Sequence, residues 1–296
     1  LFNAQSVSCD PGYGERLAHK ITIGVRKLTL FFLVVGTLPL FSTKDSTKCK
    51  FSFYGMWGYN REVYTTSTIR FQNNGSGINE NGAYDFKVMN VKAQDRPDFD
   101  QITDIMNPTI PQYNIRLGMW FNNKNDEGIE INYDHAKYVV TDYQTVTFRG
   151  TINGQYVNKD SLIDPNYFHF EHSDGANFWM VNYMKRINIY TSKNKNFKLG
   201  YVIKPGFGIV IPRTDVTLFG KELNNNWKIS GICAGMEMAA RCELYKHFVL
   251  EFSGKAGWAN YMNAFVLGRG LGKASHRFGF LEGMFCFGYQ FNMSKR

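Results

Sequence analysis

Apolar and polar side chains alternate with a period of two over most of the chain, the pattern of β-strands that have one apolar face. The final segment shows it most clearly, since Leu281, Phe285 and Phe287 fall on one face, whereas Glu282 and Gln290 fall on the other. The pattern predicts eight long strands, near residues 50–60, 113–121, 129–140, 177–190, 197–212, 226–242, 247–261 and 276–292.

The faces of these strands distinguish two architectures: a soluble barrel or sandwich with its apolar side inward, and a membrane barrel with its apolar side outward. Glycine, glutamate, lysine and asparagine recur opposite the aromatic residues. The predicted strands are also long, because soluble strands usually have about 5 or 6 residues and a tilted membrane strand needs about 9 to 11. We therefore predict an all-β, antiparallel outer-membrane β-barrel.

The lengths of the connections support this prediction, because short and long connections alternate along the chain. The short ones are 122–128, 191–196 and 243–246, and the long ones are 61–112, 141–176, 213–225 and 262–275. Outer-membrane barrels have short periplasmic turns, long outer loops and an even number of strands. We predict eight strands in a single barrel domain over residues 43–296. Ten is the alternative count, because loop 61–112 contains a predicted hairpin of 64–71 against 84–92.

The N-terminal region has the features of a targeting segment. An apolar run from 28 to 40 follows two basic residues and ends close to Ser42. The run is too short to span a bilayer as a helix, but its basic flank, apolar centre and polar exit follow the order of a signal peptide. We expect residues 1–42 to comprise an upstream extension and a signal peptide. The alternative is a short extension followed by one buried strand.

Composition and charge narrow the class of protein further. The 296 residues are 16% aromatic and 20% charged, which is too apolar a mixture for a disordered chain. The formal net charge is +9, but the predicted outer loops are mildly acidic in sum, so we expect no nucleic-acid partner. The five cysteines are dispersed, and no metal-ligand, nucleotide or other cofactor motif is present.

Charged residues also recur at inward positions of the predicted strands. The lumen of an eight-stranded barrel is small and must be filled by side chains, and a buried charge without a partner is costly. We therefore expect a paired network in the lumen, with mainly a structural role. Its predicted members are Arg116, Glu130, Asp134, Arg186, Lys198, Lys204, Glu237, Glu251, Lys255 and Glu282.

Several motifs in and beside the long loops resemble a family of uncharacterised outer-membrane β-barrel proteins of Bacteroidota-type bacteria. They are Tyr84-Asp85-Phe86, Val91-Lys92-Ala93, Asp95-Arg96-Pro97, Ile110-Pro111-Gln112, Asp134-His135-Ala136-Lys137-Tyr138-Val139 and Phe170-Glu171-His172-Ser173-Asp174-Gly175-Ala176-Asn177. The resemblance covers most of the chain from about residue 50 to 292. It implies a barrel in the outer membrane of a Gram-negative bacterium and brings no established activity.

Four residues of these motifs are candidates for ligand binding, because loops on a rigid barrel usually carry its function. His135 and Lys137 share one side of a predicted strand near its outer end, where they would meet lipopolysaccharide phosphates. The alternative is a rim lysine that snorkels without selectivity. Asp95 and Arg96 would either contact a ligand or pair their own charges and fix the loop.

His172, Ser173 and Asp174 are the candidates for catalysis, because the segment resembles the histidine–serine pair of outer-membrane lipid A deacylases. In that chemistry the histidine is the base for the serine, and an acid orients the imidazole. The sequence departs from the motif, since His172 and Ser173 are adjacent and would face opposite sides of a strand. The pattern therefore favours a protein that is not an enzyme.

We expect a structural or binding role through extracellular loops, toward another outer-membrane protein, lipopolysaccharide or an external ligand. A lipid-modifying hydrolase is the alternative function. A narrow pore is less compatible with the sequence, because so small a lumen is filled by side chains.

The predicted signal peptide gives a direct test. Sequencing the N-terminus of the mature protein, taken from outer membranes, should find a start just after Ser42, and boiling should change the mobility of the protein on a denaturing gel. A mature chain that starts near Leu1 in a soluble fraction would contradict both the export and the barrel.

Overall fold

The computed structural model describes residues 49–75, 82–96, 112–121, 126–172, 174–268 and 272–294, which all belong to one compact unit over residues 47–296. The predicted signal peptide lies outside the described residues. Within the described ranges, no helix is long and apolar enough to cross a membrane.

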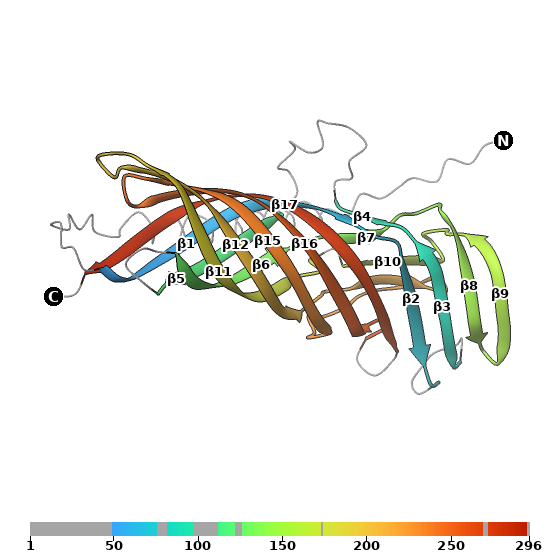
Figure 1. Ribbon diagram of the computed structural model, residues 1–296. Helices are drawn as coiled ribbons and strands as arrows, with labels where there is room; N and C mark the ends of the chain where they lie inside the picture. Colours follow the sequence, from blue (N-terminus) through green and yellow to red (C-terminus); the bar gives the residue numbers. More distant parts are fainter. Residues whose placement is uncertain are drawn as a thin grey trace, which may run out of the picture. The chain divides into compact units, whose positions relative to one another are not determined.

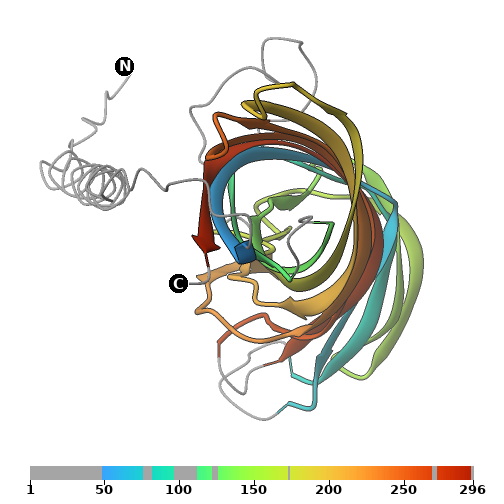
Figure 2. The ribbon, with the colours of Figure 1, turned by 60° about the vertical axis from the view of Figure 1, so that its left-hand side comes forward.

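Eight long strands form a closed ring (Figures 1 and 2). They are β1 (Cys49–Tyr64), β5 (Tyr113–Trp120), β6 (Glu127–His135), β11 (Phe178–Thr191), β12 (Phe197–Val210), β15 (Gly231–Leu244), β16 (Phe248–Phe265) and β17 (Lys273–Ser294). Each pairs with the next in antiparallel fashion, and β17 pairs back onto β1 over the whole of β1. The all-β antiparallel fold is therefore confirmed, and the ring is consistent with the predicted eight strands.

The other strands lie at one end of this ring, which we call the loop end; the opposite end, with the short connections, is the turn end (Figure 1). Beyond β17 the large sheet continues through β2 (Ser67–Asn73), β3 (Tyr84–Val91), β8 (Thr145–Ile152) and β9 (Gln155–Leu162). A second sheet contains β4 (Ala93–Gln94), β7 (Tyr138–Val140), β10 (Phe168–His172), β13 (Asp215–Leu218) and β14 (Lys221–Asn224).

These strands correct the sequence-based picture in two ways. Three of the four connections predicted as long loops, 61–112, 141–176 and 213–225, contain strands of their own, and the predicted hairpin in loop 61–112 is confirmed as β2–β3. The segment predicted as one strand over 129–140 is divided, because the chain turns at Ala136 and Lys137 and β7 joins the second sheet. Likewise, residues 225–230 connect β14 to β15 without strand structure.

The wall of the barrel forks where β1 passes into β2. Both strands lie on the same edge of β17, since Tyr64 pairs with Phe280 and Arg70 pairs with Ser275. On its other edge, β1 pairs with β5 only as far as Gly58. The other edge of β2 pairs with β3. One branch therefore closes the barrel, and the other carries the outer strands β3, β8 and β9.

An apolar core fills the loop end between the two sheets. The ring of Phe71 stacks on Phe86 at a centroid distance of 5.4 Å and meets Phe168 and Phe170 edge to face at 5.5 Å. All four side chains are buried. Aromatic pairs of this geometry add to the stabilisation by burial, so the loop end is built like an ordinary soluble β domain.

The polarity of the two faces reverses along β17. Toward the turn end, Leu281 and Phe285 face outward and are 60% and 38% exposed, whereas Glu282 points inward and is buried. Toward the loop end, Arg277 is exposed and Phe278 is buried. An apolar exterior around a charged interior is favourable only in a bilayer, so the ring spans a membrane and the loop end projects into water.

Aromatic residues mark the boundary between these two regions. Trp258 of β16 pairs with Gly279, at the point where the faces of β17 reverse. On β6 and β11, the outward-facing Tyr133 and Trp179 pair with each other, with ring centroids 4.7 Å apart. Such rings form interfacial girdles on membrane barrels, because one part of the ring lies in hydrocarbon and the other near water.

Buried charges pair across the lumen of the membrane-spanning part. Lys204 Nζ lies 2.5 Å from a carboxylate oxygen of Glu251, 3.1 Å from Glu237 and 3.2 Å from Glu130. Arg116 Nη1 lies 2.9 Å from Glu237 and 3.0 Å from Glu130. All five side chains are at most 1% exposed, so each charge depends on its neighbours for solvation.

The network extends in both directions from this centre. Toward the loop end it includes Asp134, Lys255 and Glu282, and toward the turn end Arg186, Arg241, Glu243 and Lys198. Every lumen residue named from the sequence therefore lies in the network. The prediction missed two further members: Glu243 fell in the predicted short connection 243–246, and Arg241 was left out although it lies in the predicted strand 226–242 on the same side as Glu237.

Removal of the central cation should destabilise the barrel. In Lys204→Met, three carboxylates lose their shared partner, and the free energy of unfolding should fall by about 3–5 kcal/mol. Urea titration of the protein in lipid vesicles, read from the heat-modifiable band on a gel, measures this change. Ile203→Leu, on the lipid-facing side of the same strand, should change it by less than about 0.5 kcal/mol. Equal effects of the two substitutions would contradict a stabilising network.

Candidate functional site

The structure places His172, the candidate base, in the core of the loop end. The side chain is fully buried, and its ring stacks on Tyr261 at a centroid distance of 4.7 Å. Its Nδ1 lies 3.1 Å from Thr214 Oγ1, and its Nε2 lies 3.1 Å from Nε2 of His276. Burial and the facing His276 hold the pKa of His172 well below its ordinary value, so the imidazole is neutral.

The other candidates for catalysis do not join His172 in the described structure. Asp174 forms an ion pair with Arg213, and Ser173 lies outside the described residues. Among the described residues no carboxylate orients the imidazole of His172, and the hydrolase stays a prediction from the sequence.

His135 and Lys137 lie where the chain turns from β6 into β7, and they are only 8% and 7% exposed. The ring of His135 stacks on Tyr113 at 5.0 Å, and its Nδ1 lies 2.9 Å from Asn177 Oδ1. Burial lowers the pKa of Lys137. Side chains covered to this extent present little charge at the surface, so this position does not favour the expected contact with lipopolysaccharide phosphates.

Asp95 and Arg96 do not pair their side-chain charges with each other, contrary to the expectation. Asp95 accepts hydrogen bonds from Nε of Arg61 at 2.7 Å and from the backbone N–H of Glu62 at 3.1 Å. These bonds cover the edge of β1 that β5 leaves unpaired. Arg96 Nη2 lies 2.6 Å from Glu171 Oε2, on the second sheet. The pair therefore fastens the segment after β4 to its surroundings.

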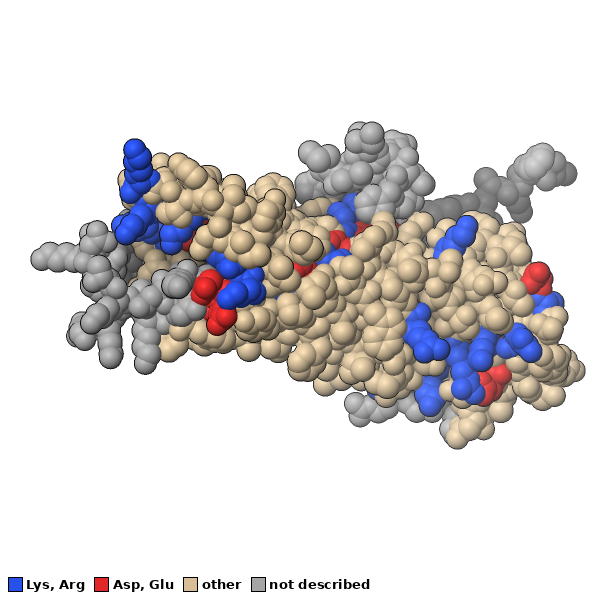
Figure 3. Space-filling view, in the orientation of Figure 1, with Lys and Arg blue, Asp and Glu red and all other residues tan. Residues whose placement is uncertain are grey.

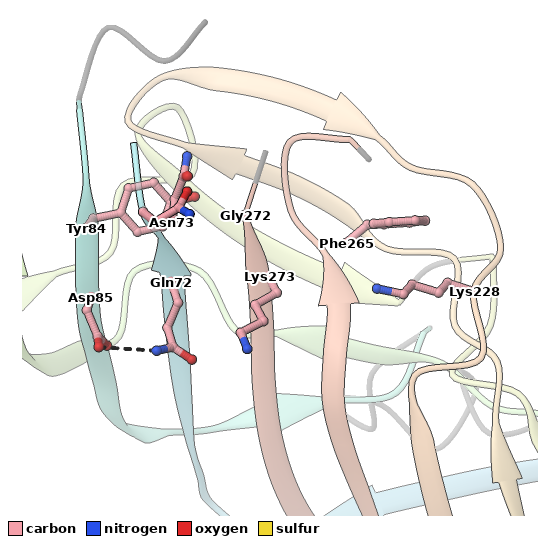
Figure 4. Close-up of a pocket in the computed structure, with 9 residues that line it drawn as sticks. Gln72, Asn73, Tyr84, Asp85, Lys228, Phe265, Gly272 and Lys273 are labelled. Atoms are coloured by element: carbon pink, nitrogen blue, oxygen red, sulfur yellow. Dashed lines mark hydrogen bonds between the residues drawn. The ribbon is translucent and has the colours of Figure 1, made fainter. Parts of the chain in front are cut away.

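A groove opens at the loop end, between the ends of β2, β3 and β17 and the connections before β15 and after β16 (Figure 4). Its first part has a volume of about 550 Å³. Gln72 donates from Nε2 to Asp85 Oδ2 at 3.2 Å, which holds the two side chains together on one wall. The lining residues are Gln72, Asn73, Asn74, Tyr84, Asp85, Lys228, Phe265, Gly272 and Lys273.

The second part of the groove, of about 650 Å³, shares Lys228 and Phe265 with the first. Nζ of Lys228 lies over the ring of Phe265, 4.4 Å from its centroid, and donates to the carbonyl oxygen of Asn263 at 2.7 Å. Trp227, next to Lys228 in the sequence, is half exposed. The remaining lining residues are Leu223, Asn224, Asn225, Asn226 and Gly268.

Gly272 and Asn225 shape the groove. Gly272 has a φ of +120°, and a Cβ at this position would come within 2.5 Å of the Tyr84 hydroxyl. Asn225 is buried; its amide donates to the carbonyl oxygen of Val266 at 2.8 Å, and its Oδ1 accepts from the N–H of Gly268 at 2.9 Å. Asn225 thus joins the two connections that form one wall.

The chemistry of the groove suits a polyhydroxylated ligand. Amide groups donate to and accept from hydroxyl groups, and a carboxylate accepts from them. An exposed aromatic ring, here Trp227, packs against apolar faces of a ligand that also has polar edges. The described residues contain no group of His, Cys, Asp or Glu side chains arranged to hold a metal ion. The groove could not be predicted from the sequence, because segments far apart in the chain form it; the run Asn224-Asn225-Asn226-Trp227 is its one local signal.

A second polar cluster lies on the water-facing side of β10. His169 Nδ1 lies 3.0 Å from Asp142 Oδ1, and its Nε2 lies 3.3 Å from Glu171 Oε2. The hydrogen bond to Glu171, together with that to Asp142, raises the pKa of His169 to about 8. Its imidazolium therefore joins β10 to the connection that follows β7.

This cluster makes the stability of the loop end dependent on pH. Because the folded pKa of His169 is above the unfolded value of about 6.5, its contribution is complete below pH ~6.5 and is lost as the pH rises through 8. At pH 5.5 the wild type should exceed His169→Gln by about 1–2 kcal/mol in unfolding free energy. Urea titrations between pH 5.5 and 9 measure the difference, and a constant difference would contradict this role.

Comparison with known proteins found distant structural neighbours. No protein-family model and no curated protein matches the chain. Ail of Yersinia pestis, solved in complex with the heparin analogue sucrose octasulfate, is 12% identical; the match covers 82% of this chain and 99% of Ail, with a TM-score of 0.31. The outer membrane protein OprG of Pseudomonas aeruginosa is 10% identical over 84% of this chain and 99% of OprG, with a TM-score of 0.36.

Neisserial surface protein A is 9% identical over 80% of this chain and 96% of that protein, with a TM-score of 0.30. At such low identities and TM-scores, no ligand and no activity can be inferred for this chain from these proteins. The location follows from the barrel itself, whose closed antiparallel ring has an apolar exterior, a charged lumen and short turns at one end only. The chain is an outer-membrane β-barrel protein.

Proposed function

We propose that this protein binds an extended glycan outside the cell, in the groove at the loop end. The orientation follows the general build of outer-membrane barrels, whose short turns and chain ends are periplasmic and whose long connections face outward. Both ends of the described barrel chain, in β1 and β17, lie at the turn end. The groove then opens toward the surroundings of the cell.

One observation carries the proposal: the groove combines six asparagine and glutamine residues, a carboxylate and two lysines with the exposed ring of Trp227 and the half-buried ring of Phe265. Its two adjoining parts, of about 550 and 650 Å³, offer room for more than one sugar unit. The ammonium groups of Lys228 and Lys273 line the groove together with the carboxylate of Asp85. This composition favours a glycan that carries acidic groups over a neutral one.

The barrel beneath the groove supports binding rather than transport. Its lumen is occupied by buried, mutually paired charges from the level of Lys255 to that of Glu243. An aromatic core then covers the lumen at the loop end, around Phe278 and Phe280. A rigid barrel filled in this way holds the outer sheets in a fixed position, and a preorganised groove binds with a smaller entropic cost.

Truncation of the exposed aromatic ring tests the proposal. Trp227→Ala should weaken binding of an acidic polysaccharide, with hyaluronate as the probe, by roughly tenfold or more, because exposed aromatic anchors dominate binding energy. Isothermal titration of the full-length folded protein in detergent measures the affinity, with dextran as the neutral comparison.

Tyr156→Ala is the matched control, since Tyr156 is an exposed aromatic residue on β9 away from the groove lining. Heat-modifiability of both variants shows that the barrel is intact. Equal affinities of Trp227→Ala and Tyr156→Ala, or no binding of either polysaccharide by the wild type, would contradict a glycan-binding groove.

A further inference from the structure

Basic side chains align across the outward face of β2, β3 and β8, beside β17 (Figure 3). Arg70 pairs with Lys87, and Lys87 pairs with Arg149, so the three lie side by side on adjacent strands. On β17, Ser275 pairs with Arg70, and Arg277 is the next residue on the same face. Strands are about 4.8 Å apart, so these four cations span roughly 15 Å. We call Arg70, Lys87, Arg149 and Arg277 the basic row.

Most of the charge of the basic row is not neutralised within the described part of the protein. Arg70 forms a bidentate pair with Asp85, with bonds of 2.7 and 2.5 Å. Lys87, Arg149 and Arg277 are exposed and form no ion pair with a described acidic residue. Like charges on directly opposed residues destabilise a sheet, and a bound anion would offset this cost.

A shallow cavity of about 530 Å³ lies over part of the basic row. Three of the cations line it, and neutral hydrogen-bonding groups lie between them. These neutral lining residues are Thr66, Ser67, Thr68, Asn90, Asn260 and Ser275. Hydroxyl and amide groups beside arginine and lysine are the donors that bind phosphate oxygens in proteins.

The height of the basic row relative to the membrane indicates which phosphate it meets. Trp258 pairs with Gly279 at the boundary of the apolar band, and Asn260 pairs with Arg277 one step farther on the same face. Two residues advance a strand by about 7 Å. Arg277 therefore lies just outside the hydrocarbon, at the depth of lipid headgroups, where each basic residue is attracted to anionic lipid.

We propose that the basic row binds the phosphate groups of a lipid A-type glycolipid in the outer leaflet beside the barrel. The row lies on the face that continues the lipid-facing wall of β17, so the nearest polyanion is the membrane itself. This binding holds the branch formed by β2, β3, β8 and β9 down against the leaflet. Lipid A binding by the row depends on the same orientation of the barrel as the proposed function, but not on Trp227, Lys228 or Phe265 of the groove.

The row also corrects an expectation from the sequence. The summed charge of the connections indicated a mildly acidic outer surface, whereas strand pairing gathers cations from β2, β3, β8 and β17 on one face. Of the acidic side chains in the same connections, Asp85 pairs with Arg70 of the row, whereas Glu171 lies against Arg96 on the second sheet.

The experiment measures binding of bisphosphorylated lipid A to the full-length folded protein in dodecyl maltoside micelles, by native mass spectrometry. Lys87→Gln/Arg149→Gln should lower the affinity roughly 25-fold, since each basic residue near a membrane surface contributes about a factor of five. Neither residue has an ion pair to lose with a described acidic side chain, so the barrel should fold, which heat-modifiability verifies.

Lys193→Gln/Lys195→Gln is the matched control, because it removes two exposed charges at the turn end and should leave the affinity unchanged. Dephosphorylated lipid A should bind more weakly than the phosphorylated form to the wild type and equally to wild type and Lys87→Gln/Arg149→Gln. Free inorganic phosphate at millimolar concentration should not displace lipid A. Equal binding of phosphorylated lipid A by the two double variants, or displacement by inorganic phosphate, would overturn the proposal. Trp227→Ala, which tests the groove, should bind lipid A like the wild type.

Discussion

Closure of the backbone hydrogen-bond ladder between β1 and β17 is the constraint on which the rest of the structure depends. No water satisfies N–H and C=O groups in the hydrocarbon of a membrane, so a sheet that spans it must have no free edge. The ladder from Cys49–Ser294 to Tyr64–Phe280 supplies the final pairing. A ring of eight strands has a narrow lumen, and the inward side chains must therefore fill it and neutralise one another, as Lys204 and Arg116 do with their glutamates.

The same strands then pass from one solvent into another. Along β17 the alternation of inward and outward positions continues, but apolar side chains change from the outward face to the inward face beyond Gly279. The interior is a charged network on one side of this level and a cluster of aromatic rings on the other. The outer part thus gains a hydrophobic core of its own, which allows the wall to fork and to carry strands that the barrel does not need.

The groove and the basic row lie on neighbouring parts of this outer sheet, and one carboxylate joins them. Asp85 forms a bidentate pair with Arg70 of the row and accepts a hydrogen bond from Gln72 of the groove. A ligand charge that competes for Arg70 therefore also changes the polar wall of the groove. The row and this wall of the groove share the outward face of the sheet, and the row lies two residues nearer the apolar band, since Ser275 pairs with Arg70 and Lys273 with Gln72.

The sequence by itself determined the strands of the ring, the outward and inward faces and most of the lumen charges, because a period of two and strand length are local properties. It also located the β2–β3 hairpin. Only the tertiary structure decided what the long connections form, since β7, β10 and β13 are short and become a sheet by pairing with one another. The burial of His172, the groove around Lys228 and the alignment of Arg70 with Lys87 and Arg149 depend on strand register and on which segments meet, and no local pattern encodes these.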